Sequence, residues 1–246
     1  MNQHRLPITE IWVYLSGSPL FALVITLLAY QTGLYLYQRF NRNPLANPVG
    51  IAIVIVSLAI NAIDMPYAEY FKGAQFVHFL LGTATVSLAV PIYRGIHQIG
   101  SRALPLFSAL IAGGLTSMIS AVGIAKLLGA DATIVKSMYA KSITAPIAMG
   151  VSETIGASPT LTAVFAVVTG ISGAIMARYI LDFFKLEAWW QRGFVIGIGA
   201  HGIGTSRAFS VHPEAGAYSS LAMGLHGVLG AVAIPLVAPL IERMFG

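Results

Sequence analysis

The sequence predicts an all-α polytopic membrane protein that forms one integral membrane domain over residues 1–246. Two observations support this prediction. First, 57% of the residues are hydrophobic and only 9% are charged, whereas about 25% of an average soluble domain is charged. Second, six stretches without Asp, Glu, Lys or Arg are long enough to cross a bilayer, whose core of about 30 Å needs roughly 20 helical residues. The composition therefore excludes an ordinary soluble enzyme.

The six predicted transmembrane helices follow one another with short polar connections. They cover residues 11–38, 43–63, 73–93, 103–125, 154–177 and 215–241. The first stretch is too long for the apolar core of a cleaved signal peptide, so we expect it to remain as a helix. The chain has no Cys, which excludes disulfides, zinc–thiolate sites and thiol nucleophiles.

Two shorter apolar segments, residues 137–152 and 193–206, are interrupted by polar or helix-breaking residues. We expect them to be broken, re-entrant helical hairpins that return to the side of the membrane they came from. With the N-terminus outside, this topology puts eight Lys and Arg residues inside and five outside, in agreement with the preference of basic loops for the cytoplasm. If both segments crossed fully, the count would reverse. The eight are Arg39, Arg42, Arg94, Arg102, Arg178, Lys185, Arg192 and Arg207.

In this topology the two hairpins are opposed, and each precedes one long span. Three residues of the first hairpin recur 60 positions later, and three of the following span recur 57 positions later. Such matches also arise by chance in a chain rich in Gly and Ala. If they are genuine, they indicate an inverted-topology repeat and a transporter-like bundle. The matched residues are Ala140, Ile143 and Ala148 with Ala200, Ile203 and Ala208, and Gly170, Gly173 and Ala174 with Gly227, Gly230 and Ala231.

The first hairpin combines a helix break with a positive charge. Pro146 has no amide hydrogen and disfavours a helical residue before it, so a helix must break or kink there. Lys141 is costly at membrane depth, and Ser142 and Thr144 supply hydroxyl groups beside it. Hydroxyl groups, a helix N-terminus and one cation together suit a small carboxylate. Alternatively, Lys141 extends to the membrane surface and Pro146 is only a kink.

The second hairpin is rich in glycine, with four glycines in eight residues. Gly202 and Gly204 weaken a helix at its centre and allow a ligand or a neighbouring helix to approach the backbone. His201 is a candidate proton carrier, although a neutral, hydrogen-bonded histidine fits equally well. Thr205 and Arg207 repeat the hydroxyl-plus-cation pattern of the first hairpin. The predicted substrate-binding residues are therefore Lys141, Ser142, Thr144, Thr205 and Arg207.

Three further polar residues are candidates for the lining of a pathway. Thr83 and Ser87 would share one face of the third span, although packing between helices through small residues explains them more simply. Asn47 begins the second span, where a turn at the helix start is the alternative. No metal, cofactor or catalytic motif is found, and the scattered Lys and Arg residues argue against nucleic acid. We therefore expect no enzyme, no metal and no cofactor.

The run KSITAPIAMGVSETIGASP at residues 141–159 resembles the most characteristic segment of the LrgB/CidB family, which includes YohK-like proteins. Pro48, YFKG at 70–73, GTATVSLAVPIY at 82–93 and HGIGTSRA at 201–208 agree with this family as well, so the resemblance covers roughly residues 40–246. One stretch departs from the family, whose members often have Ala-Ser-His-Ala-Xaa-Gly-Thr-Ala-Arg where this chain has Gly-Ala-His-Gly-Ile-Gly-Thr-Ser-Arg. His201, Gly204, Thr205 and Arg207 still match.

The resemblance implies a protein of the bacterial inner membrane and two kinds of function. The family was named for the control of murein hydrolase activity and autolysis, and its members are described as antiholin-like partners of a small membrane protein, LrgA or CidA. Related proteins transport small carboxylates: the plastidal glycolate/glycerate translocator looks like an LrgA–LrgB fusion, and bacterial relatives are linked to pyruvate uptake. Because this chain lacks the LrgA-like half, the resemblance implies a separate partner.

We therefore expect a secondary transporter of small monocarboxylates such as glycolate, glycerate or pyruvate, which works by alternating access with an LrgA/CidA-like partner. The alternative is an antiholin-like regulator of murein hydrolase export or activity that has no substrate of its own. The polar residues at the two breaks favour the transporter, since a purely regulatory protein would not need them. The sequence leaves the exact substrate, the coupling ion and a homo-oligomeric state open.

Overall fold

The computed structural model describes residues 19–87, 89–90, 93, 95 and 99–245, and every regular element among them is a helix. The all-α prediction is confirmed for this part of the chain. The structure groups into two compact units that divide between Thr83 and Ala84. Each unit is described by itself below, and the single domain over residues 1–246 stays a prediction.

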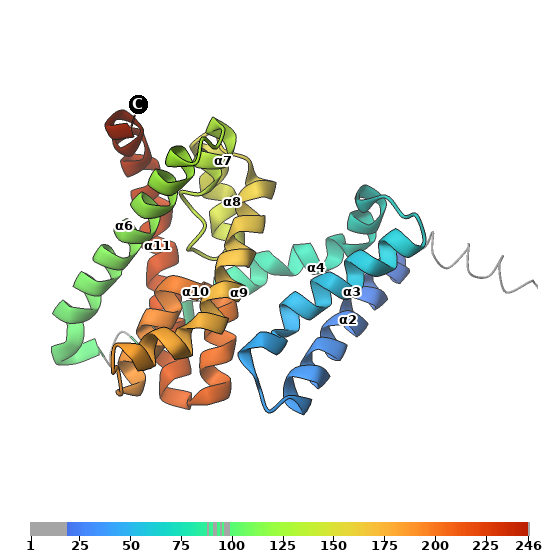
Figure 1. Cartoon of the computed structure of the whole chain (residues 1–246), viewed down its shortest axis with the longest axis horizontal. Helices are drawn as coiled ribbons and strands as arrows, with labels where there is room; N and C mark the ends of the chain where they lie inside the picture. Colours follow the sequence, from blue (N-terminus) through green and yellow to red (C-terminus); the bar gives the residue numbers. More distant parts are fainter. Residues whose placement is uncertain (1–18, 88, 91–92, 94, 96–98, 246) are drawn as a thin grey trace, which may run out of the picture. The chain divides into compact units, whose positions relative to one another are not determined.

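The first unit contains two apolar helices that lie side by side, α2 (Pro19–Arg39) and α3 (Pro48–Ala62) (Figure 1). The short helix η1 (Pro44–Ala46) connects them. The fourth element, α4 (Tyr67–Ser87), begins in this unit and crosses the division.

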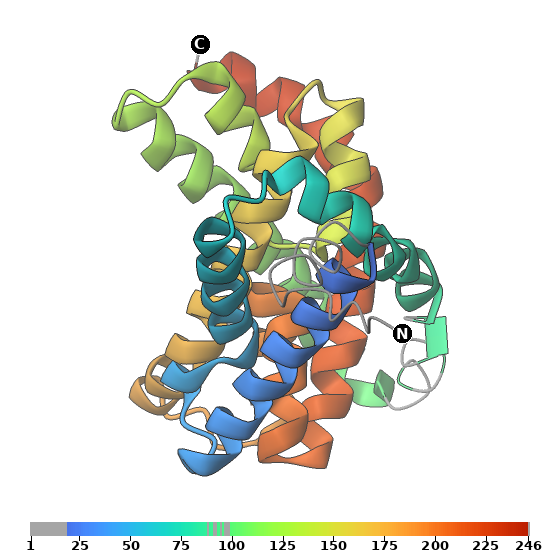
Figure 2. The same cartoon turned by 90° about the vertical axis from the view of Figure 1, so that its right-hand side faces the viewer.

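The second unit consists of three long helices with shorter elements between them. In Figures 1 and 2, α7 and α8 lie toward one end of this unit and α10 toward the other. The long helices are α6 (Ala103–Leu127), α9 (Pro159–Phe183) and α11 (Pro213–Phe245), and the other elements are η2 (Gly100–Arg102), α7 (Ala132–Ser137), α8 (Ala145–Thr154) and α10 (Trp189–Val211).

Buried apolar side chains form two clusters in the second unit, one around each interrupted segment. The first surrounds Ile143 and Ala148, before and within α8. The second surrounds Phe194 and Ile198 in α10. Side chains of α6 and α11 belong to both clusters, so these two long helices support both interrupted segments.

The chain turns back on itself between α7 and α8. α7 ends at Ser137, and residues 138–144 form turns before α8 begins. The Ser137 hydroxyl accepts a hydrogen bond from the amide of Ser158 (3.2 Å), and the Ser137 carbonyl accepts one from the Thr162 hydroxyl (3.0 Å). The hydroxyl of Ser152, near the end of α8, donates to the same Thr162 (2.6 Å). The end of α7 and the end of α8 are therefore both attached to the start of α9.

α10 reverses direction at its middle. His201 has φ 37° and ψ −131°, a conformation outside any helix. Beyond it the chain returns alongside itself, because a Cβ built on Gly204 would lie 2.8 Å from the side chain of Ile196. The two ends of α10 meet as well: the rings of Trp189 and His212 stack with centroids 4.7 Å apart. α10 is thus two antiparallel limbs joined at His201.

In the part of the chain that the structure describes, four helices are long and apolar enough to cross a membrane: α2, α6, α9 and α11. α3 is apolar but has 15 residues. Residues 11–18 of the first predicted span, and 88, 91 and 92 of the third, lie outside the described residues. A multi-pass membrane protein is supported, while the count of six full transmembrane helices and the re-entry of the two segments into the membrane stay predictions.

Candidate functional site

The two reversals of the chain approach each other along α11. A Cβ built on Gly202, just after the second reversal, would lie 3.8 Å from the sulfur of Met223. A Cβ on Gly227 would lie 2.8 Å from the side chain of Ile147, at the start of α8. Met223 and Gly227 are four residues apart, which is about one helical turn or 5.4 Å. The two reversals therefore meet near the middle of this unit.

The same arrangement occurs along α6. A Cβ on Gly113 would lie 3.3 Å from Ile198, three residues before the second reversal. One turn further along, Ser117 accepts a hydrogen bond from Lys141 of the first reversal. Along both α6 and α11, the contacts of the two reversals lie about one helical turn apart. Residues of both reversals can therefore contribute to one site.

Lys141, Ser142 and Ser117 form a compact polar cluster at the first reversal. The Lys141 Nζ donates to Ser117 Oγ (3.0 Å) and to Ser142 Oγ (3.1 Å), and the two hydroxyl oxygens are 2.6 Å apart. These bonds use two of the three N–H donors of the ammonium group. The sequence did not predict Ser117, whose only signal is a serine within an apolar span.

Thr144 is the N-cap residue of α8, yet its hydroxyl does not cap the helix. The Thr144 Oγ1 is buried and is the one buried side-chain oxygen or nitrogen without a hydrogen-bond partner among the described residues. A polar N-cap residue caps the starts of α3, α7 and α9; for example, Asp131 accepts from the amide of Ile134 (2.9 Å) at the start of α7. Since an unpaired buried hydroxyl costs about 1–3 kcal/mol, Thr144 is a polar group whose partner is missing from the protein itself.

The start of α8 is suited to an anion. The first amides of a helix have no partner within the helix, and the helix dipole places partial positive charge there. Pro146, in the first turn of α8, has no amide hydrogen, so the Thr144 hydroxyl and the amides of Ala145 and Ile147 are the donors at this end. Lys141 adds a positive charge three residues earlier in the chain.

Two buried histidines lie close to this cluster. His201 bonds through Nε2 to the carbonyl of Ala166 (2.8 Å), and His226 of α11 bonds through Nδ1 to the carbonyl of Ile198 (3.2 Å). A carbonyl oxygen only accepts, so these nitrogens carry the hydrogen, and the other nitrogen of each neutral ring is an acceptor. His226 lines one cavity together with Ser142 of the polar cluster.

The sequence-based prediction included His201 but not His226. The signal available was a histidine inside a long apolar span, where an ionisable residue is by default a functional candidate.

A cavity of about 290 Å³ connects part of this cluster to α6 and α11. Most of its lining is apolar, and Ser142, His226 and Tyr139 supply the polar side chains. A Cβ built on Gly114 would lie 3.0 Å from His226 Nε2, so the absence of a side chain there leaves room for the acceptor nitrogen of this ring.

Thr205 and Arg207 lie on the returning limb of α10. Thr205 is buried, and its hydroxyl lies 2.8 Å from that of Ser219 in α11. Arg207 lines a second cavity, at the end of α10 where its two limbs begin and finish. The structure thus brings Lys141 and Ser142 together and leaves Arg207 outside the lining of the first cavity. Gly204 is required for close packing of the two limbs, because a Cβ there would overlap that of Ala200.

Two of the three pathway candidates, Asn47 and Thr83, form local hydrogen bonds in the structure. The Asn47 side chain caps α3 by accepting from the amides of Val49 (3.0 Å) and Gly50 (3.1 Å). Thr83 and Ser87 of α4 are exposed, and Thr83 donates to the carbonyl of Leu80 (2.8 Å). Within the described residues no group of three or more His, Asp or Glu side chains could hold a metal ion.

Comparison with known proteins identifies the family. The model of the LrgB-like family matches residues 26–240. "Uncharacterized protein YwbG" of Bacillus subtilis is 32% identical over 88% of this chain and 96% of its own, and "Holin-like protein CidB" of Staphylococcus aureus is 28% identical over 89% of this chain and 95% of its own. No solved structure matches. The resemblance predicted from the motifs is confirmed, and this multi-pass membrane protein belongs to the LrgB-like family.

Proposed function

We propose that this protein is a secondary transporter of small monocarboxylates in the bacterial inner membrane, and that the substrate binds between Lys141 and the start of α8. The observation that carries the proposal is the buried Thr144 hydroxyl, which has no partner in the protein at the N-terminus of a helix. A carboxylate placed there would accept hydrogen bonds from the Thr144 hydroxyl and from the first amides of α8. It would also balance the ammonium charge of Lys141.

The substrate is small and singly charged because the cluster offers one cation and little polar surface. Among the described residues, Lys141 is the basic side chain that forms hydrogen bonds within this cluster, and the adjoining cavity is lined mainly by apolar side chains. A second carboxylate would be desolvated there without a counter-ion, which costs several kcal/mol. Glycolate, glycerate and pyruvate each carry one carboxylate and a short polar end, so they fit this chemistry.

The α7–α8 segment and α10 are the two re-entrant hairpins of this transporter, and they enter the membrane from opposite sides with the N-terminus of the chain outside. Their positions at opposite ends of the second unit support this (Figures 1 and 2). So does an exchange of contacts: Gly170 and Gly173 follow the first hairpin but approach His201 and Ala200 of the second. Gly227 and Gly230 follow the second hairpin but approach Ile147 and Ile143 of the first. Such reciprocal contacts are what an inverted repeat produces.

The alternative function is an antiholin-like regulator of murein hydrolase export and autolysis. It is favoured by one finding, the name "Holin-like protein CidB" that several relatives carry. In both functions we propose an LrgA/CidA-like small membrane protein as the partner. A regulator without a substrate does not account for the unpaired hydroxyl of Thr144, and for this reason we prefer the transporter.

Uptake of labelled pyruvate and glycolate into proteoliposomes tests the proposal, with the purified protein alone and with its partner. We expect Lys141→Gln to lower uptake at least about tenfold, because a hydrogen bond to a charged group contributes about 1.5–3 kcal/mol. Lys136→Gln is the matched control, since Lys136 forms only a half-exposed ion pair with Glu242 (3.6 Å). If wild-type protein with its partner moves no monocarboxylate, the transporter proposal is wrong.

A further inference from the structure

A second cavity, of about 380 Å³, lies at the end of α10 where its two limbs begin and finish. Three arginines from three different stretches of chain line it: Arg178 of α9, Arg192 of the first limb and Arg207 of the returning limb. Asp182 is the one carboxylate in the lining. This cavity does not share a lining residue with the cavity beside Ser142, and the proposed transport mechanism does not use it.

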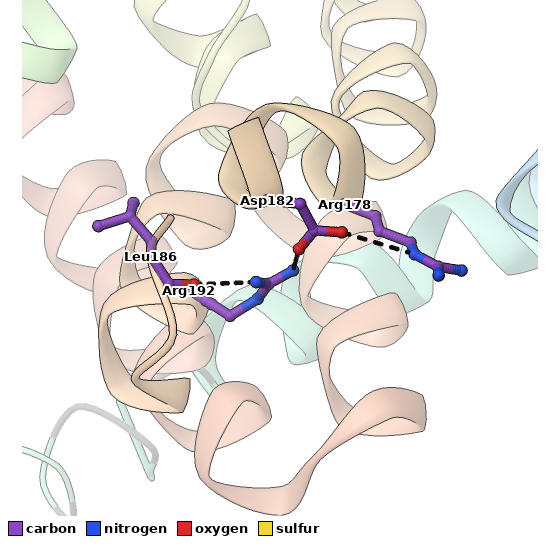
Figure 3. A network of polar contacts seen from close by, with 4 residues as sticks. All are labelled: Arg178, Asp182, Leu186 and Arg192. Atoms are coloured by element: carbon purple, nitrogen blue, oxygen red, sulfur yellow. Dashed lines mark hydrogen bonds and ion pairs between the residues drawn. The ribbon is translucent and has the colours of Figure 1, made fainter. Parts of the chain in front are cut away.

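Ion pairs with Asp182 fix two of the three arginines of this basic cavity. Arg192 donates to Asp182 Oδ1 (2.7 Å) and to the carbonyl of Leu186 (2.9 Å), and its side chain is only 16% exposed. Arg178 approaches the other oxygen of Asp182 at 3.7 Å, with a side chain that is 70% exposed (Figure 3). The lining contains three guanidinium groups and one carboxylate, so basic side chains outnumber acidic ones in it. An anion is therefore the complementary ligand.

The surroundings of the cavity indicate the depth of the membrane surface. Exposed aromatic side chains gather at this end of α9 and α10: Tyr179, Phe183, Phe184 and Trp189. Such rings are enriched at the level of the lipid headgroups. The inner wall of the cavity is apolar, formed by small residues such as Ala174, Ala177 and Ala208. A molecule with an anionic head and an apolar body matches both parts.

We infer that this cavity binds the phosphate group of an anionic phospholipid. Arginine forks match phosphate oxygens in a bidentate manner, and basic pockets between transmembrane helices bind anionic headgroups. Because Arg178 belongs to α9 and Arg207 to the returning limb, one phosphate between them would hold the second limb of α10 against α9. Lipid binding would thus stabilise the reversal at His201. This inference does not depend on monocarboxylate transport.

The test measures thermal unfolding of the purified, detergent-solubilised protein with three additives: phosphatidylglycerol, phosphatidylcholine with the same acyl chains, and inorganic phosphate. We expect phosphatidylglycerol to raise the melting temperature by about 5 °C or more at saturating concentration, and the other two to leave it nearly unchanged. An equal rise with phosphatidylcholine would overturn the inference. A rise with inorganic phosphate as large as that with phosphatidylglycerol would show that a free anion, not a lipid, is the ligand.

Variants of the cavity arginines test whether phosphatidylglycerol raises the melting temperature by binding in this cavity. We expect Arg178→Gln/Arg207→Gln to lose the shift with phosphatidylglycerol, since this double variant removes two cationic ligands and keeps the bond between Arg192 and Asp182. Lys185→Gln is the matched control, because Lys185 is exposed in the connection between α9 and α10 and does not line the cavity. A double variant that retains the full shift would refute the site. If it does not fold, Arg207→Lys replaces it, which keeps the charge but loses the fork, and we expect a reduced shift.

Discussion

The two interrupted segments of the second unit solve the same problem in different ways. Both break a helix among apolar neighbours, where unpaired backbone groups are costly. The α10 reversal is satisfied by the protein: His201 bonds to a carbonyl of α9 and Thr205 to a hydroxyl of α11. The α7–α8 reversal is incomplete, because the Thr144 hydroxyl lacks a partner, and Lys141 adds a positive charge three residues earlier in the chain. In line with the proposed function, we propose that the first segment binds the ligand and that the second provides a fixed support.

The largest expected effect is on the packing of the second segment. A Cβ on Gly193 would overlap the backbone of Ala215 in α11, and backbone atoms cannot move aside without separating the two helices. We expect Gly193→Ala to destabilise the protein by about 3 kcal/mol or more, measured as the yield of monodisperse protein and its melting temperature. Gly199→Ala is the control, because a Cβ there meets nothing within 4 Å. Similar losses in both variants would contradict a tightly packed α10.

An effect of intermediate size distinguishes residues that bind the ligand from residues that only stabilise the second segment. We expect Thr144→Val to keep or slightly raise the stability, since it removes an unpaired buried hydroxyl, and to lower monocarboxylate uptake about tenfold or more. Thr205→Val should do the opposite: it leaves the buried Ser219 hydroxyl unpaired and costs about 1–3 kcal/mol of stability, while uptake per folded protein changes little. Melting temperature and uptake, measured on the same preparations, provide both values.

Two outcomes would change the comparison. Unaffected uptake in Thr144→Val would remove the observation on which the substrate site rests. Loss of uptake without loss of stability in Thr205→Val would restore Thr205 to the substrate site, as the sequence predicts. Thr154→Val is the matched control for the first variant, since Thr154 is exposed at the far end of the same helix α8.

The sequence predicted the helical class and the locations of both breaks, because each break depends on local chemistry. Pro146 stands in the first turn of α8, where a proline is expected after a break. The glycines around residue 201 predicted the region of the second reversal, but not that His201 itself takes the positive φ, which is uncommon for this residue type.

The contacts between distant segments could not be predicted in the same way. Ser117 and His226 join the site through packing of α6 and α11, which no local pattern reports. Arg207 is six residues beyond His201 in a helical limb, so it stands about 9 Å along the axis from the reversal. For that reason Arg207, which the sequence predicts to bind the substrate, lines the cavity at the end of α10 instead.

The most restricted expected effect concerns the histidines: it changes uptake driven by a pH gradient but not substrate exchange, and it tests which reversal is coupled to protons. His226→Asn and His201→Gln each keep a side-chain N–H near the position of the bonded ring nitrogen, so the bonds to Ile198 and Ala166 can persist, but neither amide takes up a proton near neutral pH. We expect His226→Asn to lose uptake driven by an imposed pH gradient and to retain exchange of labelled for unlabelled substrate, because His226 borders the cavity with Ser142. His201→Gln should keep both activities if His201 only supports the reversal. The opposite result would assign the proton to the second segment, and loss of exchange in both variants would show that the two rings serve binding instead of coupling.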